Sequence, residues 1–177
     1  ELDSDVRIFG VGATVAQDLE PEYISISPDG SKAYATLQEN NALAIVNVLS
    51  ATVEAIVPLG FKDHSSTGNG LDASDRDGAG NTAAISITTK PILGMYQPDG
   101  IASYMAGDGT LYLVTANEGD ARDYGGLTEE ARVSTLTLDP TAFPNGAAQG
   151  YARLTVTNLL GDTDSDNDFD KLYVFGA

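Results

Sequence analysis

Nine consecutive residues near the C-terminus, 162–170, read DTDSDNDFD and place an aspartate at every second position. Two carboxylates about 6 Å apart repel each other by roughly 0.7 kcal/mol even in bulk water, so five in one short loop resist a fixed conformation unless a cation lies among them. Hard oxygen ligands at alternate positions suit calcium, which takes about 6–8 oxygens in flexible geometry. We therefore predict a calcium site formed by Asp162, Asp164, Asp166, Asp168 and Asp170.

This acidic loop differs from an EF-hand at two places. Asn167 is the sixth residue, where an EF-hand has glycine, although asparagine tolerates a left-handed turn better than most residues. Tyr173 is the twelfth residue, where an EF-hand needs a bidentate glutamate. The residues that follow, KLYVFGA, favour a strand rather than a helix. The sequence predicts a calcium-type loop that leads into a β-strand; the alternative is a solvated acidic turn without an ion.

A second group of polar residues, NEGDARDY at 117–124, follows directly on the apolar stretch LYLVTA. Its acids can hold a cation, and the guanidinium of Arg122 can bind an oxyanion as a fork. The alternative is a polar loop in which Arg122 pairs with Asp120 or Asp123. The predicted ligand-binding residues of this segment are Asn117, Glu118, Asp120 and Arg122. Asp99 joins them, because it precedes a strand that we expect to be the innermost of a blade, where Asp99 can point into the central channel.

A polar, glycine-rich insertion carries the only histidine of the chain, His64, which we include among the predicted ligand-binding residues. Three acids in its DASDRDG stretch can ligate a second cation: Asp72, Asp75 and Asp77. A catalytic pair of His64 with Ser65 or Ser66 is disfavoured, because adjacent residues rarely aim at one another and no nucleophile elbow is present. The alternative is a histidine that is solvated or makes a local hydrogen bond.

Composition narrows the class of protein. The 177 residues suffice for one domain with a core, and 26 acids against nine Lys and Arg give a net charge of −17. Such a field excludes nucleic acid and anionic membranes as partners and attracts divalent cations. No run of 18 apolar residues exists, so we expect no direct membrane insertion. Acidity, absence of cysteine and a calcium loop together favour an extracellular, cell-surface or periplasmic location.

The chain reads as short β-strands separated by turns. Alternating stretches at 22–27, 32–37, 43–48 and 52–59 predict a four-stranded antiparallel meander, the size of one β-propeller blade. The strand–turn pattern recurs after Pro98-Asp99-Gly100 and in the last residues of the chain. We predict an all-β fold built from such blades, with helix limited to a turn or two at LTEEAR, residues 127–132.

The predicted organisation is a single propeller segment over residues 1–177, with a long loop insertion at about 61–97 and an irregular stretch at about 139–150. Closed propellers need about 4–8 blades, and this chain supplies about three. We therefore expect an incomplete ring, whose partner is the remainder of its own propeller or another chain. We also expect the insertion to be ordered and to lie on the same face as 117–124.

Several segments resemble known surface proteins. EPEYISISPDGSKAYATLQENNALAIVN resembles the YVTN-type propeller repeat. PLGFKDHSSTGNGLDASDRDG, MYQPDGIASY, LVTANEGDARDY, LTLDPTAFP and GDTDSDNDFDKLYVFGA resemble, in order, the choice-of-anchor I family of secreted bacterial proteins. The resemblance implies a β-propeller that is exported and attached to the cell surface by varied C-terminal anchors. Members are often labelled alkaline phosphatase-like, but no reaction transfers. Residues 78–96 depart from the family pattern.

Two functions follow as predictions. The first is a secreted, calcium-binding β-propeller module that acts in surface display, adhesion or ligand binding. The alternative is a metal-dependent phosphoric ester hydrolase, in which a cation polarises the phosphoryl oxygen and activates water while Arg122 offsets charge. Against the hydrolase stands the shortage of cationic side chains, because a phosphate meets repulsion unless metal ions cover the carboxylates.

Overall fold

The structure, a computed structural model, describes residues 2–177, apart from the side chains of residues 148 and 149. Almost all of its regular structure is β-strand, which confirms the all-β prediction. The helices of the described chain are one short α-helix and two 3-10 turns: α1 (Val15–Asp18), η1 (Val133–Thr135) and η2 (Gly146–Gln149). No closed barrel forms among the described strands, and the number of propeller blades stays a prediction.

The chain divides into two compact units that alternate along the sequence. Unit 1 comprises Glu1–Gly60, Met95–Asp120 and Gly176–Ala177. Unit 2 comprises Phe61–Gly94 and Ala121–Phe175. Each unit has its own hydrophobic core. The predicted single propeller segment with an insertion remains a prediction.

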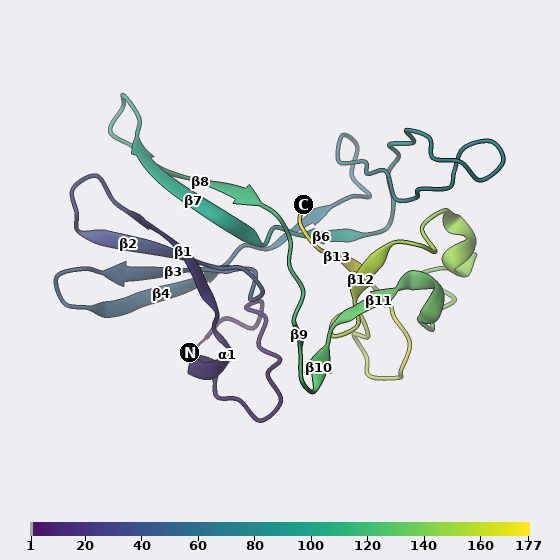
Figure 1. Ribbon diagram of the computed structural model, residues 1–177, viewed down its shortest axis with the longest axis horizontal. Helices are drawn as coiled ribbons and strands as arrows, with labels where there is room; N and C mark the ends of the chain where they lie inside the picture. Colours follow the sequence, from purple (N-terminus) through teal and green to yellow (C-terminus); the bar gives the residue numbers. More distant parts are fainter. Residues whose placement is uncertain (1) are drawn as a thin grey trace. The chain divides into compact units, whose positions relative to one another are not determined.

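Unit 1 contains the predicted meander (Figure 1). Its four strands pair antiparallel in chain order: β1 (Pro21–Ile26), β2 (Lys32–Leu37), β3 (Ala42–Asn47) and β4 (Thr52–Pro58). The core lies on one side of the sheet and includes Val6, Ala35, Leu37, Ala42 and Ala44. Small residues at these positions allow close packing, and the local turns between adjacent strands fix the register.

The first turn of the meander shows how the sequence fixes this sheet. Gly30 N donates to Ser27 O at 2.8 Å, which closes the Pro-Asp-Gly turn expected from the sequence. The Asp29 carboxylate accepts from the hydroxyls of Ser27 and Ser31 at 2.6 and 2.8 Å. The Ser27 hydroxyl is the main cause that lowers the pKa of Asp29 to about 2. A charged Asp29 therefore belongs to the folded turn.

A hairpin completes unit 1. It consists of β7 (Pro98–Met105) and β8 (Leu111–Asn117), paired antiparallel around a turn at 106–110. The Ser103 hydroxyl donates to Ile26 O at 2.7 Å and lies 3.0 Å from the Ser25 hydroxyl, so β7 packs beside β1. This arrangement brings the beginnings of β1 and β7 and the ends of β2 and β8 to one end of the unit.

Unit 2 is built from short strands. β5 (Phe61–Asp63), β6 (Leu93–Met95) and β13 (Tyr173–Val174) form a sheet in which β13 runs parallel to β6. Two antiparallel pairs complete it: β9 (Asp123–Tyr124) with β10 (Leu127–Thr128), and β11 (Glu130–Arg132) with β12 (Thr155–Thr157). Figure 1 shows that the chain between β5 and β6 runs through irregular loops.

The helix predicted at 127–132 is wrong, because this segment forms β10 and β11. Its side chains alternate between the two faces: Glu129 is fully buried, whereas Glu130 and Arg132 are exposed. Ala131 lies opposite Val156 in the antiparallel register. The helix-favouring composition of LTEEAR is outweighed by pairing with a strand that comes 25 residues later at Val156.

The core of unit 2 joins distant parts of the sequence. Phe143 and Tyr151 meet edge to face with ring centroids 6.4 Å apart. The irregular segment between β5 and β6 packs against this core through Ala73 and Ile92. Its two arms pair at the Leu71–Thr88 bridge. The other buried members are Val133, Val156, Leu172 and Val174. Leu172 and Val174 connect the core directly to the acidic loop that precedes them.

Candidate metal centre

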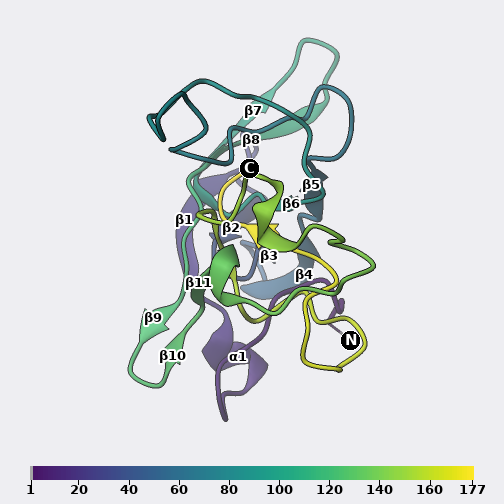
Figure 2. The same ribbon diagram turned by 90° about the vertical axis from the view of Figure 1, so that its right-hand side faces the viewer.

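The acidic loop of unit 2 begins at Gly161 and ends at Lys171. Gly161 O accepts hydrogen bonds from Asp170 N at 2.8 Å and from Lys171 N at 3.1 Å, which closes the loop at its base. Gly161 has φ +125°, and a Cβ there would lie 2.3 Å from Lys171 O. Glycine is therefore required at the base. The loop, drawn in yellow, stands out as a wide open turn in Figures 1 and 2.

The first aspartate organises the loop from within. Asp162 Oδ1 accepts from Ser165 N at 2.7 Å and from Asp166 N at 3.2 Å, and Oδ2 accepts from Asn167 N at 3.1 Å. Ser165 and Asn167 have φ of 66° and 74°, so the chain winds back around the carboxylate. The left-handed conformation expected of Asn167 is confirmed. Carboxylate oxygens keep lone pairs for a cation while they accept such bonds.

Two groups of carboxylates form along this loop. Asp162, Asp164 and Asp166 make the first group, and in each group ligand oxygens lie within 4.8 Å of one another. The second group contains Asp168 and Asp170 together with a residue outside the loop, Asp139. Asp139 arrives there because Leu138 bridges Phe169, and Asp139 N donates to Phe169 O at 3.2 Å. Sequence analysis missed Asp139, since no local pattern places it beside the loop.

Electrostatics within these two groups leaves negative charge uncompensated. Repulsion from Asp166 is the largest cause that raises the pKa of Asp164. Desolvation, followed by Asp166, raises the pKa of Asp168, and Asp168 Oδ1 is buried without a hydrogen-bond donor among residues 2–177. Asp170 differs, because hydrogen bonds from the side chain and backbone of Thr163 lower its pKa. A divalent ion would relieve this repulsion.

The acids of the insertion do not gather into such a group. In the described part of the chain, Asp72, Asp75 and Asp77 form no cluster of three with ligand atoms within 4.8 Å. Asp75 instead binds Arg153 through both oxygens, at 2.5 and 2.9 Å. Asp72 accepts from Ser86 N at 3.2 Å. A second cation on these three residues stays a prediction.

His64 is a buried hydrogen-bonding residue, with 5% of its surface exposed. Its Nδ1 lies 2.6 Å from Asn69 O, and its backbone bonds to Ile92 O and Lys90 N, each at 3.0 Å. The hydroxyls of the neighbouring Ser65 and Ser66 donate to Asp63 at 2.6 and 2.9 Å. His64 therefore has a structural role, because its hydrogen bonds join the two ends of the segment between β5 and β6.

The predicted 117–122 segment is divided between the units. In unit 1, Asn117 donates to Ala177 O at 2.8 Å. Glu118, Asp120 and Asp99 also belong to unit 1, and all three are exposed. Arg122 belongs to unit 2, where only 2% of it is exposed and its backbone N donates to Glu129 Oε1 at 2.9 Å. The contact of Arg122 with an anion stays a prediction.

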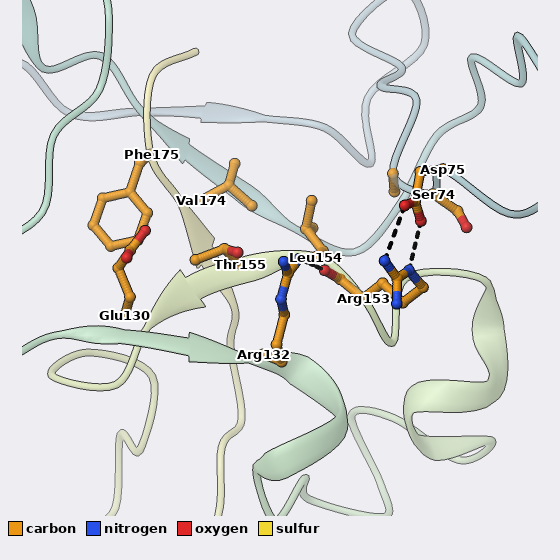
Figure 3. A pocket seen from close by; sticks show the side chains of 10 residues that line it. Ser74, Asp75, Glu130, Arg132, Arg153, Leu154, Thr155, Val174 and Phe175 are labelled. Carbon is orange, nitrogen blue, oxygen red and sulfur yellow. Dashed lines mark hydrogen bonds and ion pairs between the residues drawn. The ribbon is translucent and has the colours of Figure 1, made fainter. Parts of the chain in front are cut away.

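Unit 2 also contains a hollow of about 440 Å³ (Figure 3). Its polar wall is formed by Arg132, Arg153, Asp75 and Glu130, and Val174 and Phe175 form an apolar wall. The ion pair with Asp75 raises the pKa of Arg153 and lowers that of Asp75. Arg132 donates to the backbone oxygen of Arg153. Sequence analysis missed this hollow, because β11–β12 pairing brings its arginines together.

Comparison with known proteins identifies the family of the chain. It matches the family described as "Choice-of-anchor I domain" over residues 1–177. The chain belongs to the choice-of-anchor I family. This confirms the resemblance seen in the sequence, and the domain implies a secreted or cell-surface protein. The YVTN-type repeat and the propeller blades are not part of what this match establishes.

The other comparisons give little information on the function of this choice-of-anchor I domain. The chain is 31% identical over 131 residues to an arginine repressor of Clostridium novyi (strain NT), which covers 70% of this chain and 78% of the repressor. No solved structure matches it. Among the residues described, no helix has the length and apolar character needed to cross a membrane.

Proposed function

We propose that this choice-of-anchor I domain is a calcium-binding module at the cell surface, where it acts in adhesion or ligand binding. The observation that supports the proposal is the pair of carboxylate groups at one closed loop, which Asp139 joins from outside, with Asp168 Oδ1 buried and lacking a donor among the residues described. Native proteins rarely leave such an atom unpaired, and a bound cation would satisfy it.

The ligand chemistry favours calcium over zinc and copper. Asp162, Asp164 and Asp166 would hold one ion, and Asp168 with Asp170 and Asp139 would face a second position. All of these ligands are hard oxygens, and no histidine or cysteine stands among them, so zinc and copper are disfavoured. Extracellular modules typically bind calcium with Kd of about 10⁻⁴–10⁻³ M, which suits a surface location.

The test is calcium titration of the full chain by calorimetry. The wild type should bind calcium, and Asp164→Ala with Asp166→Ala should abolish binding at the position formed by Asp162, Asp164 and Asp166. A matched control, Asp3→Ala with Asp5→Ala, removes the same charge from exposed residues of unit 1 and should leave calcium binding unchanged. At about 100 times Kd, bound calcium stabilises the native state by about 2.7 kcal/mol. For a chain of this size that raises Tm by about 5–10 °C.

One outcome would favour the alternative, a solvated acidic turn without an ion. A wild-type chain that takes up no calcium at millimolar concentration, and whose Tm is the same in chelator, has no ion site in this loop.

The hydrolase alternative has one supporting observation, the two neighbouring groups of acids that could hold two ions. Catalysis by paired metals requires ions about 3.5–4 Å apart. The burial of Arg122 weighs against the mechanism predicted from sequence, in which that guanidinium meets the phosphoryl group. A generic phosphomonoester and phosphodiester, assayed with calcium, test the alternative. Turnover that disappears in the Asp164→Ala, Asp166→Ala variant would establish it.

The name of the Clostridium relative does not extend to this chain. A helix that reads the major groove needs several turns, whereas α1 and the 3-10 turns of the described residues have three or four residues each. The net charge of −17 would also repel DNA phosphates. We therefore propose no DNA-binding role and keep the expectation that nucleic acid is not a partner.

A further inference from the structure

Unit 1 contains two buried side-chain oxygens without a hydrogen-bond donor among the residues described. They are Glu39 Oε2 and Gln97 Oε1. Only 6% of Glu39 is exposed, and Gln97 is fully buried. An unpaired polar atom in the interior costs about 1–3 kcal/mol, and more when it is charged, so native proteins supply a proton, a water or a cation.

The two residues belong to one neighbourhood of unit 1. Gln97 Nε2 donates to Asp120 O at 2.7 Å, so the Gln97 side chain reaches the segment that follows β8. The carboxylates of Glu20, Asp120 and Glu22 act electrostatically on Glu39. Gln38, the residue before Glu39, donates through Nε2 to Gln97 O at 3.5 Å, so the end of β2 lies beside the beginning of β7.

The backbone around this group is fixed in advance. Asn41 Oδ1 accepts from Tyr96 N at 2.9 Å and from Gln97 N at 3.1 Å. Asn41 and Gln97 have φ of 51° and 44°, in the left-handed region that residues other than glycine rarely adopt. Strained residues of this kind persist only where their surroundings hold them, and they cluster at binding sites. The Gln97 carboxamide is therefore held in place before any ligand arrives.

The charge balance at Glu39 is also unfavourable. Arg7 lies nearby, and its Nη1 donates to the backbone oxygen of Glu39 at 2.6 Å. The pKa of Glu39 is raised to about 7, mainly by burial and in smaller part by repulsion from the three neighbouring acids. A carboxyl group in such a position is either protonated or compensated by a positive ion.

We infer that the Glu39–Gln97 neighbourhood is a binding site for a hard divalent cation, calcium or magnesium. The Glu39 carboxylate and the Gln97 carboxamide oxygen are its ligands, and water completes the shell. Oxygen ligands without nitrogen or sulfur select these ions over zinc or copper. The site lies in unit 1 and does not depend on the acidic loop of unit 2, so either can fail without the other.

Calorimetric titration of the full chain with CaCl₂ and with MgCl₂ tests the inference. A background variant with Asp164→Ala, Asp166→Ala and Asp168→Ala removes ligands from both carboxylate groups of the acidic loop, and one further cation per chain should still bind at pH 8. Adding Glu39→Gln should lower the affinity at least about tenfold, because it removes the only charged ligand named. The control Glu54→Gln makes the same substitution at an exposed residue that pairs with Lys32, and should leave the affinity unchanged.

Protons should compete with the ion at this site. Since the pKa of Glu39 is about 7, lowering the pH from 8 to 6 should weaken binding about tenfold in the background variant. A background variant that binds neither ion at millimolar concentration, or that binds equally well after Glu39→Gln, overturns the inference. Glu39 is then a protonated carboxyl group.

A second measurement covers the case in which Glu39→Gln does not fold. In the background variant, substoichiometric Mn²⁺ should broaden the NMR signals of the Gln97 side-chain amide and of the Glu39 backbone amide first. Broadening that begins elsewhere and spares both signals also overturns the inference.

Discussion

Glu39 makes the stability of the protein depend on pH in a direction opposite to that of most carboxylates. Its pKa is raised from 4.5 to about 7 by burial, so the folded state binds the proton more tightly than the unfolded state does. The stability that this proton contributes is fully present below about pH 4.5 and is lost as pH rises through about 7. We expect the Tm of the wild type in chelator to fall between pH 5 and pH 8.

The Glu39→Gln variant should show a flatter profile over the same range, because glutamine does not titrate. Thermal unfolding followed by circular dichroism gives both curves, with chelator present so that no ion replaces the proton. Parallel curves for the two proteins would contradict the assignment. Asp29 does not confuse the result, since its pKa of about 2 lies far below this window.

Single residues were predictable from sequence where the pattern is local. The alternating aspartates and the left-handed Asn167 follow from their immediate neighbours. Sequence analysis missed Asp139, Glu39 and Gln97, because burial and neighbours from segments distant in the sequence distinguish these residues. The sequence QENN reads as a polar turn, and only the structure shows that all four of its residues are buried.

The closure of the acidic loop depends on one glycine. Gly161→Ala places a Cβ 2.3 Å from Lys171 O in a backbone with φ +125°, so the base of the loop must open. The strain should cost of order 1–3 kcal/mol, and calcium affinity should fall with it. Urea unfolding and calcium titration measure the two effects.

Gly125→Ala is the matched control in the same unit. A Cβ at Gly125 meets nothing within 4 Å, and its φ is not positive. We expect a change within about 0.5 kcal/mol and unaltered calcium binding. If both variants bind calcium like the wild type, the loop does not need its closed base.

Secondary-structure elements were predictable where strand, turn and next strand adjoin in sequence. The meander β1–β4 and the hairpin β7–β8 follow from alternation and turn residues alone. The segment 127–132 was predicted as helix because Leu, Glu, Ala and Arg favour helices, yet its strand partner β12 lies beyond two loops. The parallel pairing of β13 with β6 was equally invisible, since nothing in either short strand identifies the other.

At the scale of the whole molecule, the chain passes between two cores that share no buried residue. The strand–turn pattern predicted the all-β class and the composition predicted the net negative charge, because neither depends on which distant segments pack together. The division into units that alternate along the chain was not predictable, since it depends on which distant segments pack together. The family match supplies the cellular context, a secreted or cell-surface protein, that no single element contains.

This division gives calcium a local effect. The acidic loop leads into Leu172 and Val174, which belong to the core of unit 2, and Asp139 lies beside it through the Leu138–Phe169 bridge. An ion bound there should therefore suppress local opening in unit 2, whereas β1–β4 should respond far less. Amide hydrogen exchange with mass spectrometry measures this by peptide.

In the Glu39→Gln background, which silences the proposed site of unit 1, we expect millimolar calcium to slow exchange over 137–139 and 161–174. The same calcium should leave 21–58 unchanged, and Asp164→Ala with Asp166→Ala and Asp168→Ala, which removes ligands from both groups, should remove the protection. Slowing that is uniform over both units would mean that calcium acts on the whole molecule rather than through this loop.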